Sequence, residues 1–261
     1  MFKSEPGMIE SGCPSSISLK NMETGHFFDI HTHILPGIDD GPATMEESLE
    51  MAKIAAEDGI RQMVVTPHTL NGVYFNERNN ILKKCEDLKR ILVKSQVPVK
   101  IIPGSEVRMC PEVISGIEND SIMTINDKKK HIFIELPDQF VQDAVICFIN
   151  RMKEKKVTPV ISHPERNYIV CNDITVLERF ILAGAMTQLT GESFLGKFGK
   201  QSLKCTRKMA SGCMIHLVGS DCHSAGKRKP ELSKAYREVV SLMGEYGANK
   251  IFFENPLKIL N

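Results

Sequence analysis

The sequence predicts an α/β fold in which parallel strands alternate with helices and close into a (β/α) barrel. From Phe27 onward, short β-branched or apolar runs alternate with longer amphipathic stretches, as in repeated βα units. The first run is not followed by a GxGxxG turn, which disfavours a doubly wound sheet. A chain of 261 residues with 42% hydrophobic content suffices for one core, so we expect one domain over residues 26–261.

Seven runs are expected to be strands, and their ends matter because barrels carry their chemistry on the loops that leave the C-terminal ends of the strands. They are Phe27–His31, Gln62–Thr66, Val99–Pro103, His131–Leu136, Thr158–Ser162, Met186–Leu189 and Ile215–Gly219.

The clearest helix is expected over Met45–Asp58. Thr44 and Glu47 have the spacing of a capping box, and Gly59 supplies the stop. Further helical patterns cover Glu77–Leu92, Val141–Lys155, Ile174–Ala183 and Glu231–Tyr246.

Residues 1–25 are rich in Ser, Gly and Pro and lack periodicity, so we expect a flexible N-terminal extension or an over-called start upstream of Met22. This segment has neither the basic nor the apolar region of a signal peptide. No stretch reaches the roughly 20 apolar residues that span a bilayer, so membrane insertion is not expected.

The charge balance and the cysteine spacing bear on the expected partners and on the cellular compartment. Lys and Arg number 33 against 32 Asp and Glu, so no electrostatic footprint indicates nucleic acid or an anionic membrane. The eight cysteines include no CxxC pair, which is typical of thiols in a reducing compartment and predicts a cytoplasmic protein. No pattern specifies an oligomeric state.

Ionisable side chains collect at the ends of six of the seven expected strands. Period two places His31 and His33, and likewise Asp221 and His223, on the same side of an extended chain, which suits a shared metal. The His31-x-His33 motif alone is equally compatible with ordinary strand histidines. Glu106 or Glu135 alone is more often a solvated or ion-paired carboxylate, and His68 alone is more often a hydrogen-bonded loop histidine. The full set is His31, His33 and Asp40, then His68, Glu106, Glu135, His163 with Arg166, and finally Asp221 with His223.

Together these residues predict a polynuclear metal site. Carboxylates gathered on one rim repel one another unless protons or cations neutralise them. Imidazole and carboxylate ligands without a thiolate suit Mn, Fe, Zn or Mg.

The motifs resemble those of a known family. The run DIHTHILPGIDDGP from Asp29 to Pro42 is followed by TPH, GSEVR, ELP, HPER and GSDCH. In this order they are similar to the PHP superfamily (polymerase and histidinol phosphatase), and most similar to its bacterial manganese-dependent protein-tyrosine phosphatases of the CpsB/YwqE type. The resemblance covers nearly the whole chain after Gly25. It implies a distorted seven-stranded barrel with two to three divalent metals, manganese foremost.

The resemblance also implies roles for individual residues. His31, His33, Glu106 and Asp221 would surround one metal. Glu106 would bridge to a second, which also takes Glu135 and His163. Asp40, His68 and His223 would hold the third, and Asp40 is also a candidate catalytic residue. Arg166 and Arg228 fall where the family places phosphate-binding arginines.

Two departures from the family pattern concern the substrate rim. Thr69 follows His68, where a second basic residue is common. Thr190-Gly191-Glu192 replaces an Asn/Ser-rich stretch before LGKFGK.

The expected reaction is hydrolysis of a phosphomonoester. Two cations about 3.5–4 Å apart would share a hydroxide nucleophile and clamp the phosphoryl oxygens. Arg166 and Arg228 would add forked contacts. A surface salt bridge is the alternative for each arginine, favoured for Arg228 because it stands in the basic run Lys227-Arg228-Lys229.

The resemblance implies a substrate as well: the phosphotyrosine-containing tail of a bacterial tyrosine kinase that controls capsular or exopolysaccharide synthesis. Phe75, Phe140 and Tyr168 could offer aromatic contacts to the tyrosyl ring, although each is equally compatible with core packing.

Other functions stay open at this point. Histidinol-phosphate hydrolysis or another small-molecule phosphoesterase activity would suit the same metals, whereas a nuclease would need a basic groove. Cys222 and Arg228 have the C-x5-R spacing of cysteine-dependent phosphatases, but Cys222 lies between two expected metal ligands. A non-catalytic scaffold would be expected to lack ligands, and none is missing.

Overall fold

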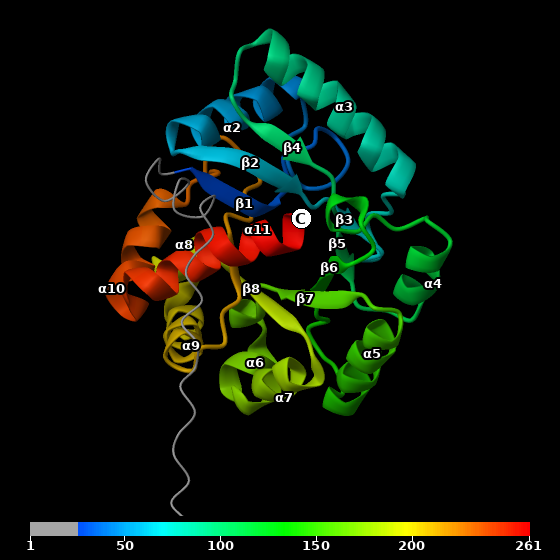
Figure 1. Ribbon diagram of the computed structural model, residues 1–261, viewed down its shortest axis with the longest axis vertical. Helices are drawn as coiled ribbons and strands as arrows, with labels where there is room; N and C mark the ends of the chain where they lie inside the picture. Colours follow the sequence, from blue (N-terminus) through cyan, green and yellow to red (C-terminus); the bar gives the residue numbers. More distant parts are fainter. Residues whose placement is uncertain (1–25) are drawn as a thin grey trace, which may run out of the picture.

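The computed structural model describes residues 26–261, so the expected extension over residues 1–25 lies outside the described residues. The described chain is an α/β structure whose nine strands pair in parallel within two sheets (Figure 1). The three-stranded sheet has the order β1-β2-β4, with bounds Phe27–Thr32, Ile60–Val65 and Lys100–Ile102. The six-stranded sheet has the order β3-β5-β6-β7-β8-β9, with bounds His68–Thr69, Glu106–Arg108, His131–Glu135, Thr158–Ser162, Met186–Thr190 and Leu217–Gly219.

All seven expected strands are present, with ends within two residues of the expected ones. The structure differs from the prediction in that two of these strands are each followed by a separate short strand. The second expected strand is followed by the short strand β3 and the third by the short strand β5, and these four segments belong to two different sheets. Pro67 and Pro103 stand at the two breaks, where a residue without an N–H cannot continue a ladder.

Hydrogen bonds join the two sheets at the C-terminal ends of the strands. Glu106, at the start of β5, donates its N–H to the carbonyl of Pro67, which follows β2, at 3.2 Å. On the flank of β1 away from β2, Asp221 donates to the carbonyl of His31 at 2.8 Å and His33 donates to that of Cys222 at 2.9 Å. The first and last strands of the described chain are therefore neighbours at this end.

Helices surround the strands (Figure 1). The capping box is confirmed in part: the Thr44 side chain accepts from the Glu47 N–H, while the Glu47 carboxylate accepts from Ala43. The α-helices are α2 Met45–Glu57, α3 Arg78–Lys94, α4 Glu112–Glu118, α5 Gln142–Glu154, α6 Tyr168–Asn172, α7 Thr175–Ala183, α8 Gly191–Phe194, α9 Gly199–Ser211, α10 Ser233–Asn249 and α11 Asn255–Leu260. Short 3-10 turns cover Ile125–Asp127 and Pro164–Arg166, and a π-helical turn covers Lys250–Glu254.

The C-terminal segment covers the end of the sheets where β1 and β9 begin. The ring of Phe27 stacks on that of Phe253 at 5.4 Å, and Asn255 donates to the carbonyl of His216 at 2.9 Å. The loops that carry the expected site residues lie at the opposite end, where the strands terminate.

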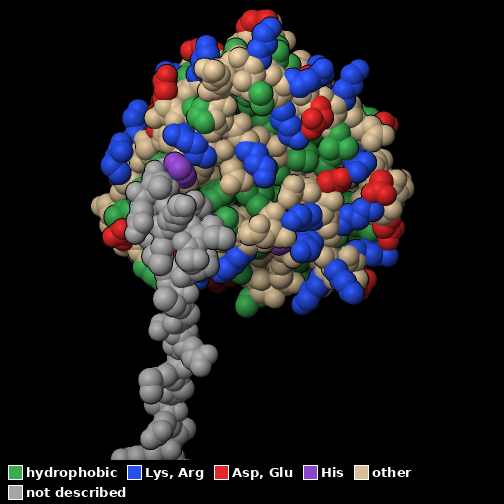
Figure 2. All heavy atoms as spheres, turned by 45° about the horizontal axis from the view of Figure 1, so that its top comes forward, with side chains coloured by type: hydrophobic (Ala, Val, Ile, Leu, Met, Phe, Trp, Pro, Cys, Tyr) green, Lys and Arg blue, Asp and Glu red, His purple; other side chains and the backbone are tan. Residues whose placement is uncertain are grey.

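The strands form the core: Ile30, Met63, Val160 and Leu217 are fully buried. Among residues 26–261, no helix is long and apolar enough to cross a membrane. On the face drawn in Figure 2, Lys and Arg side chains are spread among hydrophobic and acidic ones.

Candidate metal centre

The strand ends bring eight of the nine expected ligands into three overlapping groups. Within each group, one nitrogen or oxygen atom per residue lies within 4.8 Å of the others, a spacing that ligands about 2.0–2.2 Å from one cation would have. The groups are His33, Asp40, His68 and His223; then His31, His33 and Asp221; and then His31, Glu106 and His163.

Glu106, at the start of β5, lies at the centre of the site and is fully buried. Its Oε1 atom accepts from the Ser162 hydroxyl at 2.5 Å and lies 2.7 Å from Nε2 of His163. Its Oε2 atom has no hydrogen-bond partner among the described residues, although Nδ1 of His68 lies only 3.1 Å away and is itself without one. A buried carboxylate oxygen and a buried imidazole nitrogen left facing each other fit a cation that binds both.

His31, in β1, and His33, one residue after β1, also direct their Nε2 atoms at each other. Nδ1 of His31 lies 2.8 Å from the side-chain amide oxygen Oε1 of Gln188, and Nδ1 of His33 lies 2.8 Å from the Asp39 carboxylate. Because both partners are acceptors, Nδ1 carries the proton on each ring, so Nε2 is the free ligand atom. The two Nε2 atoms are 3.2 Å apart, an arrangement that a shared cation stabilises.

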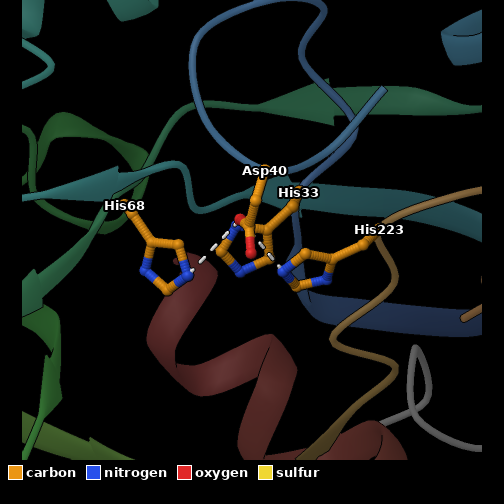
Figure 3. Close-up of side chains that lie close together, drawn as sticks. All are labelled: His33, Asp40, His68 and His223. Carbon is orange, nitrogen blue, oxygen red and sulfur yellow. Dashed lines mark ion pairs between the residues drawn. The ribbon is translucent and has the colours of Figure 1, made fainter. Parts of the chain in front are cut away.

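Asp40 stands at the outer edge of the site, on the loop after β1 (Figure 3). Its Oδ1 atom is 3.3 Å from Nε2 of His223 and 3.6 Å from Nε2 of His68. The Asp40 side chain is 49% exposed, so this group faces solvent more than the Glu106 group does. The neighbouring His223 holds the pKa of Asp40 well below its usual range, and the carboxylate is available as a ligand.

Three of the histidines are held neutral, which ligation requires. Burial lowers the pKa of His163 to about 4. Burial also lowers the pKa values of His68 and His223.

His33 behaves differently. Burial opposes its charged form, yet the carboxylates of Asp221 and Asp39 raise the pKa of His33 well above its ordinary value. Binding of a cation at Nε2 must therefore displace a proton from this ring, as is general for histidine ligands.

Asp221 links the donor groups to both arginines. Burial disfavours its charge, but Arg166 and then His33 hold the pKa of Asp221 well below its usual range. Its Oδ1 atom is 3.6 Å from Nε2 of His31, and its Oδ2 atom accepts from Arg166 at 2.8 Å and from Arg228 at 2.5 Å. The interpretation of Arg228 as a surface salt bridge is wrong, because its partner Asp221 is 1% exposed.

Backbone geometry at the site is unusual in two places. His163 and Asp221 have φ values of 34° and 53°, in the left-handed region that residues other than glycine rarely adopt. Gly219, the last residue of β9, allows this strand to approach β1: a Cβ atom there would lie 2.7 Å from Cβ of His31.

Glu135 lines the cavity above the donor groups but belongs to none of the three. Burial, and then the charge of Glu106, raise the pKa of Glu135 to about 7, while Arg108 lies 3.4 Å from its carboxylate. Its role as a ligand stays a prediction. The cavity measures about 280 Å³ and is lined mainly by polar residues, including Asp40, His163, Arg166, Asp221, His223 and Arg228.

Sequence reasoning missed the residues that orient the ligands. Asp39 and Gln188 fix the imidazoles of His33 and His31, respectively, and Ser162 donates to Glu106. Asp39 had a signal, since a histidine ligand generally donates its second N–H to a carboxylate or carbonyl. Gln188 had none, because its partner depends on the arrangement of β8 across from β1.

Of the expected aromatic contacts, Phe140 packs on Phe180 in the core, at 5.8 Å between ring centroids, so the core-packing alternative is correct there. Phe75 and Tyr168 are each 66% exposed.

Cys222 is fully buried and does not line the cavity. Burial, and then the nearby Asp29 carboxylate, raise the pKa of the Cys222 thiol well above its usual value. A nucleophilic cysteine needs an accessible thiolate, so the C-x5-R interpretation has no structural support.

Comparison with known proteins agrees with the motifs. Residues 27–261 match the family model "Capsular polysaccharide synthesis, CpsB/CapC". Tyrosine-protein phosphatase YwqE of Bacillus subtilis is 36% identical over 200 residues, which cover 77% of this chain and 78% of that protein. Tyrosine-protein phosphatase CpsB of Streptococcus agalactiae is 29% identical over 237 residues, covering 89% and 97%.

A solved structure is similar over nearly the whole domain. It comes from work on YwqE of Bacillus subtilis and CpsB of Streptococcus pneumoniae, described as unique metal-dependent tyrosine phosphatases. It superposes with a TM-score of 0.85 at 33% identity and covers 89% of this chain and 94% of that one. A lactonase from Listeria monocytogenes, with a TM-score of 0.53 and 13% identity, shares the fold alone. On these grounds the chain belongs to the CpsB/CapC family of capsular polysaccharide synthesis proteins.

Proposed function

We propose that this protein is a metal-dependent protein-tyrosine phosphatase that acts on the phosphorylated tail of a bacterial tyrosine kinase controlling capsular or exopolysaccharide synthesis. The observation that carries the proposal is Glu106 Oε2, a buried carboxylate oxygen within 3.5 Å of His31, His33 and His68. It has no hydrogen-bond partner among residues 26–261. The relatives named as tyrosine phosphatases support the substrate class.

Two to three divalent cations would be held by the three donor groups, with Glu106 shared between them and Glu135 as a further ligand. When bound, such cations make a hydroxide nucleophile available near neutral pH and neutralise phosphoryl charge. We propose that the bound cation is manganese, because the family resemblance implies it. Iron, zinc and magnesium also accept imidazole and carboxylate ligands.

The protein's own groups complete the reaction centre. Arg166 and Arg228 line the cavity, and each donates one N–H to Asp221. Their remaining N–H groups can therefore bind phosphoryl oxygens. Asp40, half exposed at the mouth, can bind a cation and orient an incoming water. A tyrosyl phenolate, with a pKa of about 10, leaves more readily than a seryl alkoxide, so no strong general acid is required.

We also propose that the two sheets form one distorted seven-stranded barrel of the PHP type. The hydrogen bond from Glu106 to Pro67, after β2, and those that join β1 to Asp221 and Cys222, after β9, support this arrangement. The cysteines of the described chain are free thiols, which supports a cytoplasmic location.

The test is a steady-state comparison of phosphotyrosyl, phosphoseryl and histidinol phosphate substrates, before and after chelation and with Mn²⁺ restored. The proposal expects phosphotyrosine to give the highest kcat/KM, with activity lost on chelation and regained with the metal. A tenfold preference for histidinol phosphate would replace it with the small-molecule phosphoesterase alternative.

A further inference from the structure

Cys171, in α6, and Cys205, in α9, form a pair of thiols close to the metal centre. The Cys205 thiol donates a hydrogen bond to the sulfur of Cys171, so the two sulfur atoms are in contact. A second hydrogen bond joins the same two helices, because the Gln201 side-chain amide donates to that of Asn172 at 3.3 Å. The packing of α6 on α9 therefore holds the two thiols against each other.

The thiol pair is connected to Arg166 from two sides. Cys171 donates its S–H to the carbonyl of Glu165 at 3.0 Å, and Glu165 directly precedes Arg166 in the Pro164–Arg166 turn. On the other side, α9 begins one residue after Phe198, whose ring lies 4.9 Å from Cζ of Arg166. A change in the covalent state of the pair therefore acts on both segments that contact this arginine.

The two thiols differ in their access to solvent. Cys205 is 2% exposed, whereas Cys171 is half-buried and lines a hollow of about 240 Å³ that also touches Arg166. The hydrogen bond from Cys205 lowers the pKa of the Cys171 thiol, whereas burial raises the pKa of Cys110, which is also half-buried, to about 11. Because the thiolate is the reactive form of cysteine, Cys171 is the member of the pair that a small oxidant from solvent attacks.

We propose that Cys171 and Cys205 are an oxidation site that forms a reversible disulfide with hydrogen peroxide, and that this disulfide lowers the activity of the metal centre. The effect on activity rests on the proposed function, whereas the disulfide does not. Transient disulfides of this kind act as redox sensors in reducing compartments.

The reaction has two steps. The Cys171 sulfur attacks one oxygen of hydrogen peroxide: an S–O bond forms, the O–O bond breaks and one water leaves, so the thiol is oxidised by two electrons to a sulfenic acid. The Cys205 sulfur then attacks the Cys171 sulfur: the S–S bond forms, the S–O bond breaks, and the hydroxide leaves as water with the proton of the Cys205 thiol. Two thiols and one peroxide give one disulfide and two waters.

The disulfide changes the surroundings of Arg166 in two ways. Cys171 no longer carries an S–H, so the Glu165 carbonyl loses its donor. The two sulfur atoms also move from hydrogen-bond contact to about 2.0 Å, which draws α6 towards α9. Both changes shift the turn that carries Arg166, and its N–H groups then meet the phosphoryl group less well.

The test treats the full chain, reduced and loaded with Mn²⁺, with hydrogen peroxide and measures intact mass and kcat/KM for an aryl phosphate before and after dithiothreitol. The mass should fall by two hydrogen atoms, and trypsin should release Asn167–Arg179 linked to Cys205–Arg207. The value of kcat/KM should fall several-fold and return on reduction. No disulfide, or one between other cysteines, would overturn the pair.

Two further outcomes separate this inference from the proposed function. A Cys171–Cys205 disulfide with unchanged kcat/KM would overturn its effect on the metal centre. Absence of phosphatase activity in the reduced protein, with the same disulfide still formed by peroxide, would instead overturn the proposed function.

Three variants assign the roles. Cys205→Ser should stop the reaction at the sulfenic acid, which dimedone traps at Cys171. Cys171→Ala should form neither product and keep its own kcat/KM under peroxide, and a fall equal to that of the unaltered chain would show that peroxide acts on the metal centre directly and overturn the effect of the disulfide. Cys213→Ala, which removes an exposed cysteine after α9, should form the disulfide as the unaltered chain does.

Discussion

Asp39 accepts a hydrogen bond from Nδ1 of His33 at 2.8 Å and thereby determines that Nε2 of this ring faces Glu106 and Asp221. Asp39 also accepts from the N–H groups of Gly41 and His68, so one carboxylate organises the loop after β1 and the start of β3. Residues that orient a ligand in this way are nearly as important to a metal site as the ligands.

Asp39→Asn is accordingly expected to lower metal affinity and activity by about 10–100-fold. The amide keeps the shape of the side chain, but it lacks the negative charge that stabilises the N–H of a histidine bound to a cation. Metal titration and kcat/KM on an aryl phosphate measure the effect. Asp143→Asn on α5 is the control, since Asp143 is 83% exposed. Unchanged affinity in Asp39→Asn would show that the loop orients His33 without the carboxylate.

Arg166→Ala is expected to reduce kcat/KM for phosphomonoesters. The reduction should correspond to a loss of about 2–4 kcal/mol of transition-state stabilisation, which is the scale of one preorganised donor at a charged centre. Inorganic phosphate should also inhibit this variant more weakly. Arg179→Ala removes an arginine of α7 that pairs with Asp143 at 2.9 Å and should leave both quantities unchanged. If Arg166→Ala retains its kcat/KM, Arg166 serves only to pair with Asp221.

Gly219→Ala tests the close approach of β9 to β1. The added methyl group would lie 2.7 Å from Cβ of His31, so we expect a loss of about 1–3 kcal/mol in the free energy of unfolding. Urea denaturation measures it. In Gly226→Ala the nearest atom would be the Ser224 hydroxyl at 3.9 Å, and a change within about 0.5 kcal/mol is expected. Equal stability of the two variants would mean that the strands separate at little cost.

Cys222→Ala is expected to retain most of the catalytic rate, because the thiol is buried outside the cavity. Loss of a true nucleophile costs on the order of 10⁴-fold or more in kcat. Cys147→Ala, at an exposed cysteine, controls for general effects of thiol removal. A collapse of kcat in Cys222→Ala with metal content and melting temperature unchanged would revive the cysteine mechanism.

Much of the fold could be predicted because the local signals were strong. Thr158–Ser162 was predicted with its observed bounds, and the Thr44 cap and Gly59 frame α2 as expected. The short strands β3 and β5 were missed because two or three residues carry no periodicity. Helix α9 was also missed: it begins at Gly199, with φ of 91°, and its exposed face is rich in lysine.

The clustering of ionisable side chains could be predicted where it follows from position in the chain. His31 and Asp221 stand at strand ends, Glu106 follows β4 at the start of β5, and the barrel rule indicates that such positions meet on one face. The partners Gln188 and Ser162 could not be predicted, because they depend on which side chains of distant strands face each other. The burial of the Arg228 ion pair was not predicted, because Lys227, Arg228 and Lys229 together resemble a solvated basic run. In the structure its guanidinium binds the buried carboxylate of Asp221.

The presence of the metal centre is tested most directly by the metal content of the purified full chain, combined with anomalous diffraction from crystals grown with Mn²⁺. We predict two or three cations per chain, with Glu106 shared between two of them and His33, Asp40, His68 and His223 at the outer positions. One cation or none under metal-replete conditions, with the side chains of the three groups pointing apart, would contradict a polynuclear metal centre.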